Sequence, residues 1–422
     1  MIALSMSPAS PVWRPLATGD LARELRDTVD AIASALRDHA ATGDVTLSHG
    51  DPGIALFFLY RALAFDDDGD RELAIDLVER VLDRLALAAM RPELFGGWFG
   101  TGWVVEHVAR LAGIEADAGE LCTAARSVIA HGAWRGHYGL ATGLIGAGVY
   151  ARECGEAGRG ALVDTLGELA ELAEYHPDAV AWYTPAEQLA ELPIVLEMAP
   201  DGCYDLSLAH GIPGAIAFLA HATRAGLYTR PLLGPAVRWL LAHALPPGAA
   251  STFSRWWFPG PGVKFARNAW CIGDPGVATA LLLASEALGD ATLRAHAIAV
   301  GQRAAARAVD DPTGRVVDAG LCHGAAGLAH VFNRLYQRTG DLAFAEASRR
   351  WLARVLAMRG IQASAGAGRF AGFRALITPR WDAPPELRDE PGLLAGAAGI
   401  GLALLAAISD VEPSWDRLLL LS

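Results

Sequence analysis

The sequence predicts an all-α protein built as a ring of seven helical hairpins. Two observations lead to this prediction: a Gly-x-x-Gly pair recurs seven times in 422 residues, and an apolar helical run follows each pair. A hairpin whose inner helix is apolar nearly all round cannot bury itself, so neighbouring hairpins must stack. The seven pairs are Gly50/Gly53, Gly97/Gly100, Gly143/Gly146, Gly211/Gly214, Gly273/Gly276, Gly324/Gly327 and Gly396/Gly399.

The residues around these pairs predict the two helices of each hairpin. In four repeats a further glycine (113, 226, 289, 340) ends the apolar run, as expected of a glycine just after a helix. More charged segments, such as Arg71–Leu87 and Asp341–Met358, separate the apolar runs and carry apolar residues at helical spacing. Each repeat therefore consists of an amphipathic outer helix and an apolar inner helix.

The stacked hairpins form either an open solenoid or a closed, double-layered α/α toroid. The first and last copies carry the same apolar inner pattern, whereas an open array needs polar caps at both ends. Closure is therefore favoured. The expected organisation is one domain, 1–422, with repeats over about 47–407. The long gaps between some glycine pairs leave room for loop insertions near 181–203, 246–264 and 360–389.

Composition excludes several classes of partner and compartment. A formal net charge of −12 leaves no basic surface for nucleic acid or anionic lipid. Five scattered cysteines and a start without a basic, then apolar, signal pattern predict a cytoplasmic protein. The 18 uncharged residues Gly392–Ser409 reach the length of a membrane span, but they resemble the other apolar runs, so no membrane insertion is expected.

The loops of repeats five and six carry the residues that predict a metal site. Cys271 and Cys322 each lie two residues before the first loop glycine, so stacked repeats bring both thiols into one space, and His323 follows Cys322. Two thiolates and an imidazole suit Zn²⁺, and three protein ligands leave its fourth position open, as in catalytic sites. The plainer interpretation is two small buried hydrophobes and a core histidine. No other cofactor site is indicated.

The chain resembles the lanthionine synthetase C-like (LanC) cyclases. The resemblance rests on Trp270-Cys271-Ile272-Gly273-Asp274-Pro275-Gly276, Cys322-His323-Gly324 and Leu208-Ala209-His210-Gly211-Ile212-Pro213-Gly214. It implies an α/α toroid with one zinc ion. It also implies an enzyme that adds a peptide cysteine thiol to dehydroalanine or dehydrobutyrine, forming lanthionine or methyllanthionine rings in lanthipeptide antibiotic biosynthesis. The implied substrate is a precursor peptide dehydrated by a separate dehydratase.

The resemblance also assigns two catalytic residues, and the chemistry supports both. Thiol addition needs a thiolate, leaves negative charge on an enolate oxygen and ends with protonation of Cα. By resemblance His210 is the general acid/base, since imidazole titrates near neutrality. Arg267, four residues before Cys271, matches the arginine that stabilises the enolate oxygen.

One departure from the family pattern weakens this expectation. Members usually carry aspartate four residues before the first loop glycine of repeat three, where this chain has Gly139. Asp205 or His137 are candidate substitutes for that acid. His49 occupies the same loop position as His210, and either a catalytic role or a hydrogen bond within its own loop would account for it.

Three functions follow as alternatives. The first is a stand-alone zinc-dependent lanthipeptide cyclase. The second is a LanC-like protein that joins glutathione or another thiol to dehydrated residues, or a binding scaffold without cyclase activity. The third is another α/α enzyme, a zinc prenyltransferase subunit or a glycosidase, but the loops lack the aspartate ligand and the carboxylate pair that these need. The precursor, its ring pattern, the leader-binding surface and the oligomeric state are not encoded in these patterns.

Overall fold

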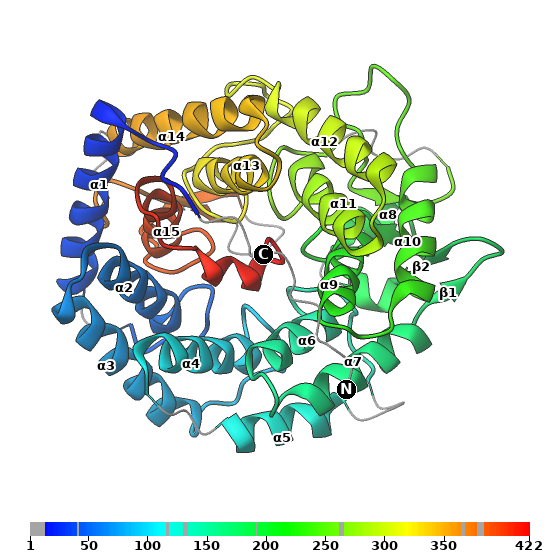
Figure 1. The fold of residues 1–422 in the computed structure, drawn as a ribbon, viewed down its shortest axis with the longest axis horizontal. Coiled ribbons are helices and arrows are strands. Elements are labelled where there is room, and N and C mark those ends of the chain that lie inside the picture. Colours follow the sequence, from blue (N-terminus) through cyan, green and yellow to red (C-terminus); the bar gives the residue numbers. More distant parts are fainter. Residues whose placement is uncertain are drawn as a thin grey trace, which may run out of the picture.

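The computed structural model describes residues 13–39, 42–114, 118–129, 134–190, 192–260, 266–363, 368–377 and 384–422. Within these ranges the chain forms two concentric layers of helices around a common centre, which confirms the predicted α/α toroid (Figure 1). The predictions about the N-terminal start and about residues 191, 261–264, 364–367 and 378–383 of the insertions lie outside the described residues.

The inner layer consists of one helix from each Gly-x-x-Gly repeat. These helices are buried along nearly their whole length, because their residues face the outer layer, the neighbouring inner helices or the centre. In α15, for instance, every residue from Ala397 to Ala407 is buried. The inner helices are α2 (Asp51–Phe65), α4 (Trp98–Ala112), α6 (Leu144–Glu153), α9 (Ile212–Arg224), α11 (Asp274–Leu288), α13 (Ala325–Thr339) and α15 (Ala397–Ile408).

The outer layer covers the inner one with amphipathic helices. Outer helices pack on the inner helices of their own repeat, as α3 does on α2 and α12 on α11, and α1 packs on α15, so the two ends of the chain meet. The outer helices are α1 (Gly19–Arg37), α3 (Asp68–Leu85), α5 (Ala118–Ile129), α7 (Arg159–Glu171), α10 (Arg230–Ala242), α12 (Ala291–Ala305) and α14 (Leu342–Ala363).

The two glycines of each repeat are required by the loop that leads into the inner helix. A Cβ on Gly97 would lie 2.1 Å from the carbonyl oxygen of Arg91, six residues earlier, and one on Gly100 would lie 1.7 Å from that of Leu94. The chain thus folds back against itself at both positions, at distances that no Cβ tolerates. The same approach recurs at Gly273 and Gly276, with 2.2 Å to the carbonyl oxygens of Arg267 and Trp270.

A closed ring of backbone hydrogen bonds joins the seven loops. In each repeat the residue two before the first glycine, here called the ring residue, donates its N–H to the carbonyl oxygen of the ring residue in the next repeat. The last of these bonds runs from Leu394 to Ser48 and closes the circle. The bonds, in order, are Ser48 to Phe95 (3.0 Å), Phe95 to Ala141 (3.5 Å), Ala141 to Ala209 (2.9 Å), Ala209 to Cys271 (3.1 Å), Cys271 to Cys322 (3.4 Å), Cys322 to Leu394 (2.7 Å) and Leu394 to Ser48 (3.3 Å).

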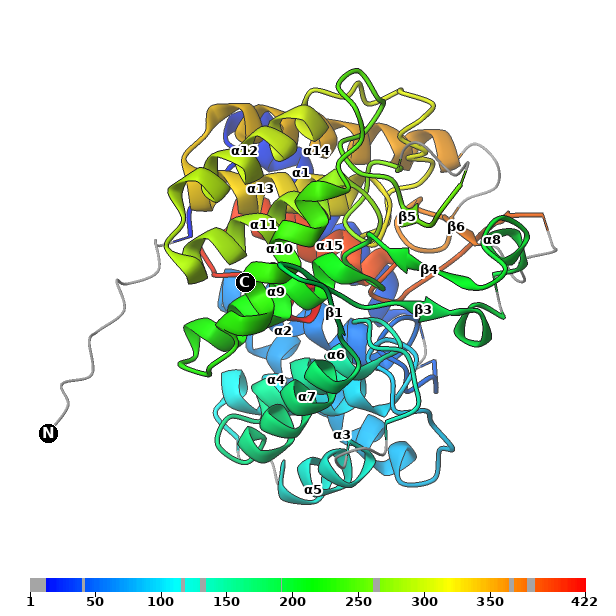
Figure 2. The same ribbon diagram turned by 90° about the vertical axis from the view of Figure 1, so that its right-hand side faces the viewer.

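Strands β3 (Thr184–Pro185), β4 (Gly202–Asp205) and β5 (Trp256–Trp257) lie beyond one end of the helical ring (Figure 2), whereas β1 (Glu174–Tyr175) and β2 (Val180–Ala181) form a hairpin beside the outer helix α10. Strand β4 pairs with both β3 and β5, and it leads directly into the loop of repeat four. A small separate core of Leu189, Val195, Cys203 and Trp256 supports this sheet. The strands and short helices are β1 (Glu174–Tyr175), β2 (Val180–Ala181), β3 (Thr184–Pro185), η1 (Ala186–Leu189), α8 (Pro193–Met198), β4 (Gly202–Asp205), β5 (Trp256–Trp257), β6 (Ala375–Ile377) and β7 (Glu386–Arg388).

The C-terminal segment occupies the centre of the toroid (Figure 1). Its 3-10 helix η2 (Ser414–Leu419) is buried, with Trp415 stacked on His330 and Asp416 accepting a hydrogen bond from His330 at 2.8 Å. At the end of η2, the Leu419 carbonyl oxygen accepts a hydrogen bond from the Trp270 indole N–H at 3.0 Å. The centre is therefore packed rather than open. The apolar run at Gly392–Ser409 forms α15, and no helix of the described residues has the length and apolarity of a membrane span.

Candidate metal centre and its surroundings

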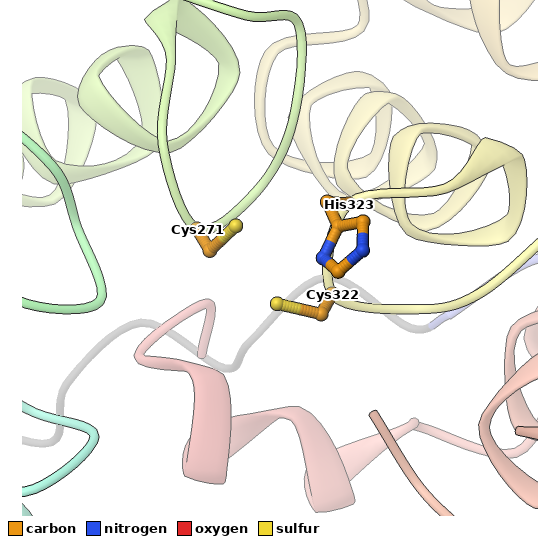
Figure 3. Close-up of side chains that lie close together, drawn as sticks. All are labelled: Cys271, Cys322 and His323. Carbon is orange, nitrogen blue, oxygen red and sulfur yellow. The ribbon is translucent and has the colours of Figure 1, made fainter. Parts of the chain in front are cut away.

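The structure brings the three predicted zinc ligands together. Cys271, Cys322 and His323 converge from the loops of repeats five and six (Figure 3). One ligand atom from each lies within 4.8 Å of those of the other two. The backbone reason is the ring: Cys271 and Cys322 are both ring residues, and the N–H of one donates to the carbonyl of the other. His323, the residue after the ring residue, shares this space.

The donor set and its surroundings fit a zinc ion. Ligand atoms around tetrahedral zinc lie about 3.5–4 Å apart, given bond lengths of about 2.0–2.3 Å, so only small side-chain adjustments separate the observed cluster from that geometry. Cys271 is 4% exposed, whereas Cys322 and His323 are half-buried, so the cluster is closed on the side of Cys271 and open on the other. The opening leaves a position for a ligand from solution.

Electrostatics favour a thiolate in this cluster. Hydrogen bonds from Cys322 and then His323 hold the pKa of Cys271 well below its usual range, against the effect of burial, and the Arg267 charge acts in the same direction. A thiol that ionises readily is a ready metal ligand, because the thiolate is the form that binds.

His210 lies one residue beyond the neighbouring ring residue, Ala209, which bonds to the Cys271 carbonyl at 3.1 Å. Burial lowers the pKa of His210, and the nearby Asp205 carboxylate opposes this effect. The imidazole is thus neutral near pH 7 and able to accept a proton. Loop four holds it in place, since its backbone N–H donates to Ser207 Oγ at 3.3 Å.

The residue six before each first glycine is here called the anchor residue, and it is an arginine only in repeat two (Arg91) and repeat five (Arg267). In five loops the anchor side chain accepts the backbone N–H two residues on, as Asp205 does from Ser207 at 2.7 Å. Arginine has no acceptor, so at Arg267 the loop gives up this bond. Its guanidinium donates to the Arg315 carbonyl at 2.6 Å, and its charge acts on Cys271 and His323. The five accepting anchors are Asp44, His137, Asp205, Asp318 and Glu390.

Arg255 is a second cation of this site that sequence reasoning missed. It precedes β5, and its carbonyl accepts the Leu206 N–H at 2.8 Å, which ties the insertion to loop four. Burial lowers the pKa of Arg255, while the charges of Asp205 and Cys271 oppose this. Its guanidinium lies 3.9 Å from the Trp256 ring centroid. The only sequence signal was an arginine within an aromatic insertion.

Gly139 leaves no room for the acid that the resemblance leads one to expect. A Cβ there would lie 2.6 Å from the His210 carbonyl oxygen and 2.8 Å from Nδ1 of His137. His137 itself accepts the Gly139 N–H at Nδ1, and its Nε2 lies 3.3 Å from Thr184 Oγ1. Burial, followed by the His210 charge, lowers the pKa of His137 to about 4. His137 is therefore neutral at physiological pH and poorly suited as the missing acid.

His49 lies on the same ring of loops but in a different environment. Its Nδ1 lies 3.3 Å from Glu390 Oε2, and its side chain is 51% exposed. The hydrogen bond with Glu390 raises the pKa of His49, which burial opposes, and the Glu390 and Asp44 charges add to the rise. The sequence did not identify Glu390 as the partner of His49, because the two residues lie at opposite ends of the chain.

Comparison with known proteins decides the family. Residues 41–420 match the family described as "Lanthionine synthetase C-like protein". The chain belongs to this family. No curated protein matches this LanC-like chain. Among solved structures it is similar to "Nisin cyclase", with a TM-score of 0.70 and 18% identity over 96% of this chain and 98% of the other.

A second solved structure, a "sugar epimerase from ruminal bacterium", matches this LanC-like chain with a TM-score of 0.45 and 12% identity over 92% of this chain and 97% of the other. The nisin cyclase match, at 18% identity, establishes the fold and not the chemistry. The family match and the nisin cyclase match agree with the predicted toroid.

Proposed function

We propose that this LanC-like protein is a zinc-dependent lanthipeptide cyclase, which adds peptide cysteine thiols to dehydroalanine or dehydrobutyrine. The observation that carries the proposal is the convergence of Cys271, Cys322 and His323 on adjacent loops, open on one side, with His210 and Arg267 close enough for their charges to interact with that of Cys271. Family membership and the nisin cyclase fold support it. The whole chain acts as one LanC-like domain in this proposal.

The residues of the site divide the work of the addition. Cys271, Cys322 and His323 would hold a zinc ion, which would supply the Lewis acidity that favours the thiolate form of a substrate thiol. His210 is neutral near pH 7 because burial lowers its pKa, so it accepts the proton that the thiol loses. The thiolate sulfur then bonds to Cβ of the dehydrated residue, and the electron pair of the double bond moves to the amide oxygen.

Arginine side chains stabilise the enolate oxygen that results. Arg267 gives up a loop hydrogen bond that most anchors make, and its guanidinium lies where its charge acts on the zinc ligands. Arg255 adds a second guanidinium from the insertion, near His210 and Cys271. Fixed cations aimed at a developing oxyanion cost no reorganisation during the reaction.

Gly139 supports the second candidate function. Since the expected aspartate is absent and a side chain there would require loop four to move, this chain uses a different proton donor, or joins glutathione or another thiol to dehydrated residues, or binds them without cyclising them. The proposed partners are a dehydrated precursor peptide and a separate dehydratase. All five cysteines are free, which suits the cytoplasm as the proposed compartment.

The test is incubation of the purified, zinc-loaded protein with a dehydrated precursor peptide, and separately with that peptide and glutathione. Free thiols are then counted by alkylation and mass spectrometry. Loss of thiols without a mass change supports cyclisation, and a glutathione increment supports the second function. Unchanged thiols and mass in both reactions contradict both enzymatic functions.

A further inference from the structure

Three loops carry histidine at the same place, the residue directly after the ring residue, here called the rim residue: His49, His210 and His323. The structure shows what makes them different. Each rim histidine lies near the anchor residue of the preceding repeat, its neighbour around the ring: His49 contacts Glu390, the charge of His210 acts on His137, and the charge of Arg267 acts on His323. The anchor therefore sets the charge beside each imidazole.

These partners favour different protonation states. Beside Glu390 an imidazolium is stabilised, whereas beside the neutral His137 and in a buried position His210 stays neutral. His323 differs from both, because it lies in the candidate metal cluster with Cys271 and Cys322. The pKa of His49 is raised and that of His210 is lowered. A pair with such opposite shifts is suited to acid–base chemistry, with His49 as the acid and His210 as the base.

The contacts of Glu390 fix the orientation of the His49 imidazole. Glu390 Oε1 accepts the Gly392 N–H at 3.1 Å, and its Oε2 lies 3.3 Å from Nδ1 of His49. One carboxylate oxygen thus holds the loop and the other holds the ring, with Glu390 14% exposed and His49 51% exposed. Because Nδ1–H is committed to Glu390, Nε2–H is the proton that remains for a substrate.

The size of the loop ring places His49 within reach of a substrate at the metal centre. Backbones joined by such hydrogen bonds lie about 4.8 Å apart, so seven of them enclose a circle of about 5.5 Å radius. Repeats one and six are two steps apart, which corresponds to about 9 Å between their backbones on this circle. The half-exposed His49 therefore lies on a loop only two positions away, around the loop ring, from the loop of Cys322 and His323.

We propose that His49, held by Glu390, is the general acid that protonates Cα of the substrate after thiol addition. After the sulfur–Cβ bond has formed, the enolate electron pair returns to Cα and takes the proton from Nε2 of His49. His49, half-exposed, regains a proton from water. This inference rests on the proposed cyclase function, and it supplies the donor that Gly139 cannot.

The position of His49 has a stereochemical consequence. The thiolate approaches from repeats five and six, whereas the proton comes from repeat one, at a different point of the loop ring, so the same Cα face is protonated in every turnover. Without His49, water protonates Cα from either face. The ratio of the two lanthionine diastereomers therefore reports on His49 directly, and a merely structural role leaves it unchanged.

The experiment compares wild type with His49→Asn, Glu390→Gln and the control His296→Asn, an exposed histidine of the outer helix α12. Each zinc-loaded protein is given a dehydrated peptide in D₂O, and the product is hydrolysed and analysed by chiral gas chromatography with mass detection. We expect His49→Asn to slow thioether formation by about 100-fold and to yield both diastereomers, with zinc content unchanged. In Glu390→Gln the alkaline limb of the rate profile moves to lower pH, because His49, facing Glu390 and Asp44, loses its nearer carboxylate.

Different results overturn different claims. If His49→Asn yields one diastereomer at the wild-type rate, His49 is not the acid, and the cyclase function stands. If His49→Asn loses zinc or unfolds and Glu390→Gln leaves the pH profile unchanged, the dyad is structural and the inference is wrong. If wild type forms no thioether, the proposed function fails and the inference falls with it.

Discussion

At the scale of single residues, close backbone approach decides what each loop position accepts. The anchor position takes a side-chain acceptor in five loops, and the position two residues later packs against the next loop. At that position Gly139 lies against His210, and Gly392 lies against His49, where a Cβ would be 2.5 Å from Cα. A glycine at this loop position therefore reflects close packing against the next loop as well as the chemistry of the site.

We predict that Gly139→Ala damages the protein although alanine is the smallest change. The added Cβ would lie 2.6 Å from the His210 carbonyl, so loop four must move, and stability falls by about 2–3 kcal/mol. Chemical denaturation measures the loss. The matched control is Gly234→Ala in α10, where the nearest atom is 3.6 Å away and stability rises by up to about 1 kcal/mol. Equal stabilities for the two variants would contradict the close approach.

We predict that Cys271→Ala removes stoichiometric zinc. Two remaining ligands, Cys322 and His323, leave an incomplete donor set, so affinity drops by several orders of magnitude. Metal content after dialysis against a weak chelator checks this. Cys203→Ala, a buried cysteine of β4 whose pKa burial raises to about 12, serves as the control and keeps its zinc. Retention of one zinc per chain in Cys271→Ala would refute the ligand assignment.

At the scale of elements, a directed chain of hydrogen bonds joins three inner helices to the C-terminal segment. Ser414 Oγ lies 2.8 Å from Tyr60 OH, which lies 2.9 Å from Nε2 of His107, and Nδ1 of His107 lies 2.7 Å from Glu153 Oε1. Because burial lowers the pKa of His107, its ring is neutral, so Nδ1–H donates to Glu153 and Nε2 accepts from Tyr60. Arg110 and Arg417 also contact Glu153.

We predict that Glu153 makes the fold sensitive to acid. Burial raises its pKa, but the hydrogen bond and charge of His107 and the nearby arginines outweigh burial and lower it from 4.5 to about 2. The folded state thus binds fewer protons than the unfolded chain, and stability present above about pH 4.5 is lost as the pH falls toward 2. Urea titrations at several pH values measure this slope.

If Glu153 causes this loss of stability in acid, then replacing Glu153 should make the free energy of unfolding less dependent on pH. Glu153→Gln should lower the free energy of unfolding at neutral pH by roughly 3–5 kcal/mol, because buried cations lose their partner. Below pH 4.5 the stability of this variant should depend less on pH than that of wild type. Glu79→Gln, on the exposed face of α3, should keep the wild-type slope. An unchanged slope in Glu153→Gln would assign the acid sensitivity elsewhere.

At the scale of the whole molecule, closure makes the repeats interdependent. The ring of loop hydrogen bonds ends where it begins, and the N-terminal segment joins the last repeat, since the Trp13 indole donates to the Ala406 carbonyl at 2.9 Å and the Leu16 and Ala17 N–H groups donate to Ala407. An open solenoid unfolds repeat by repeat, whereas removal of one repeat from a closed ring exposes two apolar faces.

We predict that the toroid unfolds in one cooperative transition that Trp13→Ala shifts as a whole. Trp13 is 2% exposed, so its truncation costs about 3–5 kcal/mol, and helix content and tryptophan fluorescence should lose their signals at the same denaturant concentration. Leu87→Ala, at an 89% exposed site, is the control. Separate transitions for the two probes would indicate independent unfolding of repeats.

The sequence by itself determined the repeat, the toroid and the three residues that form the candidate metal cluster. The information is local: each Gly-x-x-Gly loop specifies its own tight backbone, and Cys271 and Cys322 occupy equivalent positions of copies that are adjacent along the chain. The roles of His210 and Arg267 stay predictions, although the structure places both beside the cluster.

Only the tertiary structure decided which side chains meet across the ring. His49 faces Glu390 from the other end of the chain, Arg255 reaches the site from an insertion, and Gly139 packs so closely on His210 that a side chain would displace loop four. The physical reason is that each repeat encodes the conformation of its own loop. Which loops become neighbours at the point of closure depends on how many repeats complete the circle. Hydrogen bonds between ring residues, and not proximity in sequence, bring His49 to a carboxylate and so to its proposed place in the chemistry.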